Sequence, residues 1–100
     1  MTKVKLFPSG FSVKGHCSAN ENDEAGKLVC AAVSSAVYLV ANTITEIIGD
    51  KADITERDGE MTVKVLSLSE SSKTVLSGFK IHILQLEEQY PDCIKVNSEV

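Results

Sequence analysis

No apolar run in this sequence reaches the roughly 18 uncharged residues that a membrane-spanning helix requires. The longest candidate, residues 28–40, is shorter and contains two serines. The N-terminal segment has lysines, but it has neither a long apolar block nor a small-residue cleavage site, so no secretory signal is expected. We therefore expect a cytoplasmic protein that has no membrane partner.

The sequence has fewer basic residues than acidic residues. The chain carries 10 lysine and arginine residues against 14 acidic residues, which gives a net charge of -4. A domain that coats nucleic acid by neutralising phosphates needs the opposite sign. The composition therefore predicts no direct nucleic-acid partner, and it suits a cationic partner instead.

Cysteine occurs only three times, at Cys17, Cys30 and Cys93. An odd number of cysteines in a chain without export features argues against a disulfide framework, so we expect free thiols. The histidines and cysteines lack the paired spacings of zinc sites, and no metal or other cofactor is expected. Strand alternation makes Cys17 a packing residue, and packing is also the simpler interpretation for Cys93.

Proline and glycine number only two and six, and no low-complexity tract or internal repeat divides the chain. A chain of 100 residues, 43% of them apolar, can bury one core but not two. We expect a single domain that spans residues 1–100.

Hydrophobic periodicity predicts strands and helices in the order β-β-α-β-β-α, with a possible final strand. The expected hairpins join 2–7 to 10–17 and 52–57 to 61–67, the expected helices cover 27–49 and the segment between the serine-rich stretch and Pro91, and 93–96 would be a short edge strand. This order predicts an α+β fold, a two-layer sandwich in which a mainly antiparallel sheet is covered on one face by two helices. A sheet covered on one side needs a polar opposite face or a partner, and this suggests a homodimer.

Two residues could form a nucleophilic pair. Cys30 is expected in the first turn of the first helix, where free N–H groups and the helix dipole favour a thiolate. His16 ends the preceding strand, and an imidazolium near the sulfur would lower the thiol pKa. Such a dyad could attack an acyl carbon while helix amides hold the oxyanion. From the residues alone, a small core cysteine and a merely exposed histidine remain open alternatives.

Other polar residues could assist this pair. Ser34 lies one turn after Cys30, where it could hydrogen-bond near the thiol or to its own helix backbone. Glu21, Asp23 and Glu24 could orient the histidine or attract a basic substrate, and a solvated charge run is the alternative.

The chain resembles the ribosomal-processing cysteine protease family of bacteria. The matching residues are Gly15-His16, the sequence LVCAAVS at 28–34, and Gln-Tyr-Pro at 89–91, and the resemblance covers nearly the whole chain. It implies a homodimeric cysteine endopeptidase that removes the N-terminal extension from protein twenty-seven of the large ribosomal subunit. The expected partner is thus the N-terminal segment of that ribosomal protein.

By motif position, the resemblance makes Cys30 the nucleophile, His16 the general acid/base and Ser34 a supporting residue. The family typically has an aspartate three residues before the cysteine, where this chain has Lys27, and a loop acid such as Asp23 could substitute for it. The acidic loop could also steer a basic substrate by charge. The alternative function is a non-catalytic, ribosome-associated protein of the same fold that binds the peptide.

Overall fold

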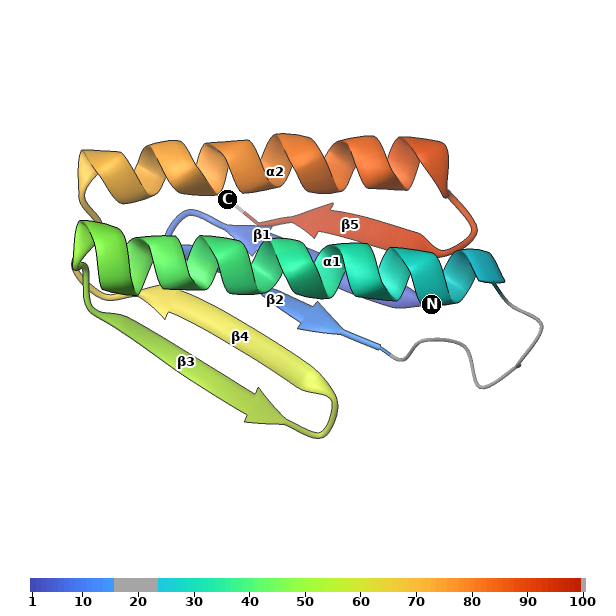
Figure 1. Ribbon diagram of the computed structural model, residues 1–100, viewed down its shortest axis with the longest axis horizontal. Coiled ribbons are helices and arrows are strands. Elements are labelled where there is room, and N and C mark those ends of the chain that lie inside the picture. The colour runs from blue at the N-terminus through green and yellow to red at the C-terminus, as the bar shows by residue number, and fades with distance from the viewer. Residues whose placement is uncertain (16–23, 100) are drawn as a thin grey trace.

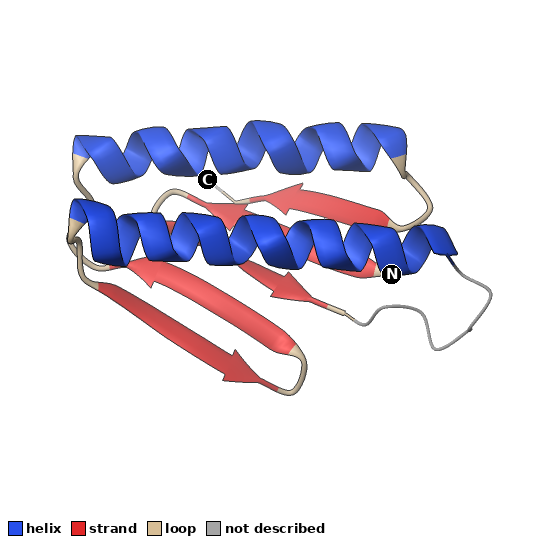
Figure 2. Ribbon diagram, in the orientation of Figure 1, coloured by secondary structure: helices blue, strands red, loops and turns tan. Residues whose placement is uncertain are grey.

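The computed structural model describes residues 1–15 and 24–99. Five strands form one mixed sheet in the order β3-β4-β2-β1-β5, and both helices lie across the same face of it (Figures 1 and 2). Three strand pairings are antiparallel, and β1 pairs with β5 in parallel. The elements are β1 (Thr2–Phe7), β2 (Gly10–Lys14), α1 (Glu24–Asn42), its π-helical continuation η1 (Thr43–Ile48), β3 (Ala52–Arg57), β4 (Glu60–Val65), α2 (Glu70–Gln89) and β5 (Ile94–Ser98). The predicted α+β fold is confirmed.

Turn residues set both hairpins where the sequence predicts them. Pro8 and Ser9 join β1 to β2, and the Ser9 carbonyl accepts a hydrogen bond from the Val65 N–H at 2.8 Å. Asp58 and Gly59 have positive φ angles of 53° and 76°, the conformation that a tight two-residue hairpin turn requires. The second hairpin is therefore fixed in register, and β3 extends past the helices (Figure 1).

The first helix is continuous from α1 into η1. Gly49 ends it with a left-handed φ of 86°, and its N–H donates to the Ile44 carbonyl at 2.9 Å. The sequence predicts that this helix ends at residue 49, and the left-handed glycine at its C-terminus agrees with that prediction. The helix starts at Glu24, three residues before the predicted start at residue 27. The prediction began too late because the first turn consists of polar and small residues, which have no apolar periodicity.

The helix from Glu24 to Ile48 is long and apolar enough to cross a membrane. The search for an unbroken apolar run in the sequence did not indicate this. The core helix of a soluble protein passes the same test. Here Val29, Val33 and Val37 are almost fully buried in the core that the helices share with the sheet. These apolar residues therefore have a packing role within the fold.

An aromatic pair links the sheet to the second helix. The rings of Phe11 in β2 and Phe79 in α2 stack with their centroids 4.1 Å apart and their planes 25° from parallel. Both side chains are buried. The same core cluster contains the other large buried residues, chiefly Val4, Ile44, Val63, Ile83 and Ile94.

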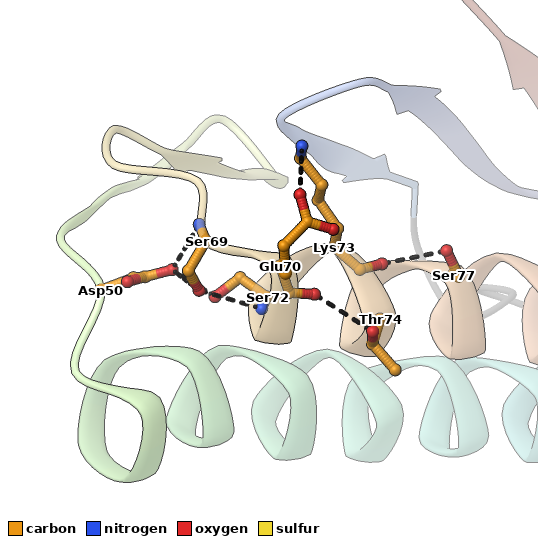
Figure 3. A network of polar contacts seen from close by, with 7 residues as sticks. All are labelled: Asp50, Ser69, Glu70, Ser72, Lys73, Thr74 and Ser77. Carbon is orange, nitrogen blue, oxygen red and sulfur yellow. Dashed lines mark hydrogen bonds and ion pairs between the residues drawn. The ribbon is translucent and has the colours of Figure 1, made fainter.

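A carboxylate fastens the end of the first helix to the start of α2 (Figure 3). One oxygen of Asp50 accepts hydrogen bonds from the Ser69 hydroxyl at 2.6 Å, the Ser72 hydroxyl at 2.6 Å and the Ser69 N–H at 3.0 Å. Ser69 is also the N-cap of α2, since its hydroxyl accepts a hydrogen bond from the Ser72 N–H at 3.2 Å. These hydrogen bonds hold the pKa of Asp50 below its ordinary value, and the bond from the Ser69 hydroxyl has the largest effect.

We expect Asp50→Asn to destabilise the protein at neutral pH and to have little effect in acid. The lowered pKa of Asp50 means that its ionised form stabilises the fold above the carboxylate's unfolded-state pKa, and that this contribution disappears as pH falls through the folded-state value. Urea unfolding between pH 7 and pH 2 measures the difference. The exposed Asp92→Asn is the matched control, and a constant gap between wild type and Asp50→Asn at every pH would contradict the prediction.

Candidate active site

A pocket of about 220 Å³ opens where the end of β2, the middle of α1 and the β3–β4 hairpin meet. Cys30 and Ser34 line it from the helix, and Gly15 lines it from the residue after β2. The rest of its wall comes from the neighbouring strands and helix, namely Thr2, Val13, Val33, Val37, Tyr38, Glu56, Gly59 and Met61. At this size it suits one part of a peptide, because pockets for whole drug-sized ligands run to roughly 300–1,000 Å³.

Helical spacing puts Cys30 and Ser34 together. They are one turn apart on α1, and their side chains reach the same pocket, as predicted. Cys30 is half-buried, and Ser34 is exposed. The pocket thus presents a sulfur and a hydroxyl from one face of one helix.

The helix start corrects one expectation about Cys30. Because α1 begins at Glu24, Cys30 lies in the second turn and not in the first. The unpaired N–H groups and the dipole effect of a helix are confined to its first turn. The first-turn amides of α1 are therefore not adjacent to Cys30, and we expect a different donor for an oxyanion beside its sulfur.

The oxidation state of Cys30 also differs from the expectation of three free thiols. Cys30 is disulfide-bonded. Cys93 is a free cysteine, half-buried against the hydrophobic core, which confirms its packing role. Nucleophilic chemistry at Cys30 requires the thiolate, so it requires prior reduction of this disulfide.

Gly15 brings the end of β2 close to the start of β1. Its φ is 129°, and a Cβ there would collide with the Met1 carbonyl oxygen and lie 3.1 Å from the Thr2 Cα. Such a close approach of another backbone is one of the common reasons for a glycine at the end of a strand. Gly15 therefore fixes the direction in which the chain leaves the sheet beside Cys30.

We expect Gly15→Ala to lower the free energy of unfolding by about 2 kcal/mol or more, because alanine is strained at this φ and has no room. Gly78→Ala is the matched control: Gly78 lies within α2, a Cβ added there would meet nothing within 4 Å, and the change should stabilise by about 0.5–1 kcal/mol. Chemical denaturation of both variants measures the effect. Equal stabilities would contradict this account of Gly15.

Several sequence-predicted site residues lie outside the described part of the chain. These are His16, Glu21 and Asp23. Glu24 is described and is the exposed first residue of α1. The structure thus brings together Cys30, Ser34 and the residue that precedes His16.

Sequence reasoning missed Glu56. This residue contributes a carboxylate to the pocket from β3, where it follows Ala52 and Ile54 on the face that the helices cover. The sequence does contain a signal for it: Glu56 is a charged residue that follows two apolar residues on the same face of β3. Tyr38, one turn beyond Ser34 on α1, was missed because helical periodicity alone places it on the solvent side.

Solved structures share the fold at low sequence identity. The ribosomal processing protease Prp from Staphylococcus aureus, in complex with a covalently linked product peptide, matches with a TM-score of 0.86 and 19% identity, covering 99% of this chain and 100% of that one. The same protease with a substrate peptide matches with a TM-score of 0.87 and 18% identity over the same shares. SMU.848 from Streptococcus mutans has a TM-score of 0.77 and 21% identity, covering 98% of this chain and 93% of that one.

No curated protein matches the chain significantly. The family model described as cysteine protease Prp, in contrast, matches residues 1–95. That match includes all of the described residues that line the pocket. The chain therefore belongs to the cysteine protease Prp family.

Proposed function

We propose that this protein is a cysteine endopeptidase that removes the N-terminal extension of protein twenty-seven of the large ribosomal subunit during ribosome assembly in the cytoplasm. The observation that carries the proposal is the pocket lined at once by Cys30, Ser34 and Gly15 in a chain of the Prp family. The S. aureus structures, which are of a ribosomal processing protease with substrate and product peptides, support a peptide substrate here.

In the proposed mechanism, Cys30 and His16 act as a dyad. The Cys30 thiolate attacks the scissile carbonyl carbon, and a thioester forms as His16 protonates the leaving amine. Water, deprotonated by His16, then attacks the thioester and releases the Cys30 sulfur and the new carboxylate. Gly15 supports this assignment, because it lines the pocket and directly precedes His16 in the sequence.

Ser34 is the proposed donor to the oxyanion. The first-turn amides of α1 lie away from Cys30, whereas the exposed Ser34 hydroxyl lines the same pocket as the sulfur. We expect Ser34→Ala to lower kcat by about a hundredfold while KM changes little, as for loss of one oxyanion donor. Ser35→Ala, the exposed neighbour that does not line the pocket, is the control. A change confined to KM would instead assign Ser34 to substrate binding.

Acidic residues are proposed to attract the basic substrate. Glu56 contributes a carboxylate to the pocket itself, and Glu24 lies at the exposed start of the helix that carries Cys30. Together with Glu21 and Asp23 they would steer a cationic segment, so kcat/KM should fall as ionic strength rises. Kinetics that are independent of salt would remove this role.

The proposal also includes a homodimer, for a reason that differs from the sequence argument. The uncovered face of the sheet is polar, so it needs no partner to shield it. Exposed apolar side chains lie instead on the first helix, where Leu28 and Leu39 are 59% and 69% exposed. Sedimentation analysis of the reduced protein tests the dimer, and a monomer at micromolar concentration would exclude it.

A peptide that spans the precursor junction tests the activity directly. The protein is first treated with a reductant, because Cys30 is disulfide-bonded in the structure, and is then incubated with the peptide. Mass determination should show two products from one cut after the apolar, aromatic-containing stretch. Binding of the peptide without cleavage would favour the alternative function, a non-catalytic ribosome-associated protein that holds the peptide.

A further inference from the structure

The face of the sheet opposite the helices is uncovered in the part of the chain that the structure describes. Both helices pack on the other face (Figure 2). In β1 the burial pattern alternates, with Val4 buried and Lys3 and Lys5 exposed. Every second residue of each strand therefore faces outward on what we call the open face, and the strand register shows which residues are neighbours there.

The open face has a charge opposite to that of the whole chain. Its strand positions hold six cationic side chains and two acidic ones, a net charge of +4 in a chain of net charge -4. Glu99, one residue beyond β5, pairs with Lys5 at 3.6 Å and reduces the local excess to +3. The cations are Lys3, Lys5, Lys14, Arg57, Lys64 and Lys95, and the acids are Asp53 and Glu60.

Three of these lysines lie side by side on adjacent strands. Lys3 is directly opposite Lys14 in β2 on one side and Lys95 in β5 on the other. Adjacent strands are only about 4.8 Å apart, and like charges directly opposite one another destabilise a sheet. No ion pair joins any of the three to a described carboxylate. The row therefore carries uncompensated positive charge at the cost of some sheet stability.

The same row continues across the remaining strands. Lys14 is in register with Glu60, and Glu60 with Arg57, so five charged side chains cross the five strands, four of them cationic. Four strand spacings make this row about 19 Å long. The next row has a hydrogen-bonding side chain on every strand, namely Thr55, Thr62, the buried Ser12, Lys5 and Asn97.

We propose that the open face binds the sugar–phosphate backbone of double-stranded RNA. A sheet face with a row of cations and neighbouring hydroxyl and amide groups complements a line of phosphates. Recognition of single strands usually relies on aromatic side chains that stack on bases, and the half-buried Phe7 is the only aromatic residue at an outward strand position in the described chain. Duplex RNA, which is recognised largely by shape and backbone, fits the surface better.

The open face and the candidate active site do not overlap. The pocket is lined by inward-facing strand residues such as Val13 and Met61, whereas Lys14 and Glu60 beside them face the opposite way. A bound duplex would therefore leave the pocket accessible to a peptide. This inference does not depend on proteolysis, and either proposal can fail without the other.

Fluorescence anisotropy with a labelled 20-base-pair RNA duplex and the reduced protein tests the proposal. We expect binding at 50 mM salt that weakens steeply by 200 mM salt. The double variant Lys3→Gln, Lys95→Gln should bind about tenfold more weakly and show a salt slope smaller by about 2, one for each lost phosphate contact. Lys73→Gln, Lys80→Gln on α2 removes the same charge and should retain affinity within about twofold.

Several outcomes would overturn the proposal. They are absence of duplex binding by wild type at 50 mM salt, an equal loss of affinity in the two double variants, or binding to anionic phospholipid vesicles with none to RNA. Thermal unfolding shows that the variants are folded, and the open-face variant should be at least as stable as wild type because like charges have been separated. Cleavage of the short junction peptide should be the same in both double variants and in wild type.

Discussion

Cleavage of the junction peptide should fall to background in Cys30→Ala, at least about a thousandfold below wild type in kcat/KM, because the variant has no sulfur to form the thioester. The fold should persist, since the half-buried side chain is small and its removal leaves the stripe of buried valines on α1 intact. Mass spectrometry of the products and circular dichroism of the variant measure the two effects.

Cys93→Ala is the matched control for this experiment. Cys93 is a free, half-buried cysteine away from the pocket, and its replacement should leave cleavage unchanged. All variants are compared in the presence of a reductant, because Cys30→Ala also removes a disulfide. Alkylation by iodoacetamide should then label Cys30 much faster than Cys93. Retained cleavage in Cys30→Ala would refute the assignment of the nucleophile.

Ile44→Ala should lower the free energy of unfolding by about 2–5 kcal/mol, which is a large part of the 5–15 kcal/mol that such domains have in total. The Ile44 side chain is 0% exposed and belongs to the core between the helices and the sheet. Its loss removes apolar burial and leaves a cavity. Urea unfolding measures the change, and thermal unfolding should show a midpoint lower by roughly 10 °C or more.

Ile47→Ala provides the matched control in the same π-helical turn. Ile47 is 80% exposed, so the same truncation three residues along should change stability by no more than about 0.5 kcal/mol. Both variants alter the helical propensity of η1 alike, and the difference between them isolates burial. Similar losses in the two variants would show that the π-helical end of the helix, and not the core, determines the effect.

Local chemistry explains why the sequence predicted most of the fold. A tight hairpin turn requires residues such as Asp58 and Gly59, which have positive φ angles. The spacing of the valines on α1 indicates a buried helix face, and a serine such as Ser69 is typical of the start of a helix. Each of these signals acts within a few residues. The parallel pairing of β5 with β1 joins segments more than 90 residues apart, and no local pattern specifies such a register.

The candidate site was predictable only in part, for similar reasons. Helical spacing placed Ser34 beside Cys30, and the motif that carries the family resemblance included Gly15. Glu56 reaches the pocket through the pairing of β3 with β4, which the periodicity of one strand does not reveal. The net charge likewise does not reveal the distribution of charge: it sums over the whole chain, whereas folding collects six of the ten cations on one face.

The pairing of the first strand with the last has a consequence for synthesis of the protein. Thr2 donates its N–H to the Cys93 carbonyl at 2.9 Å, so one side of β1 acquires its partner only when β5 is available. During translation β1 would remain an unpaired edge until β5 leaves the exit tunnel, and such edges readily pair with other chains. Folding of this sheet is therefore completed only after β5 has been synthesised and released from the tunnel.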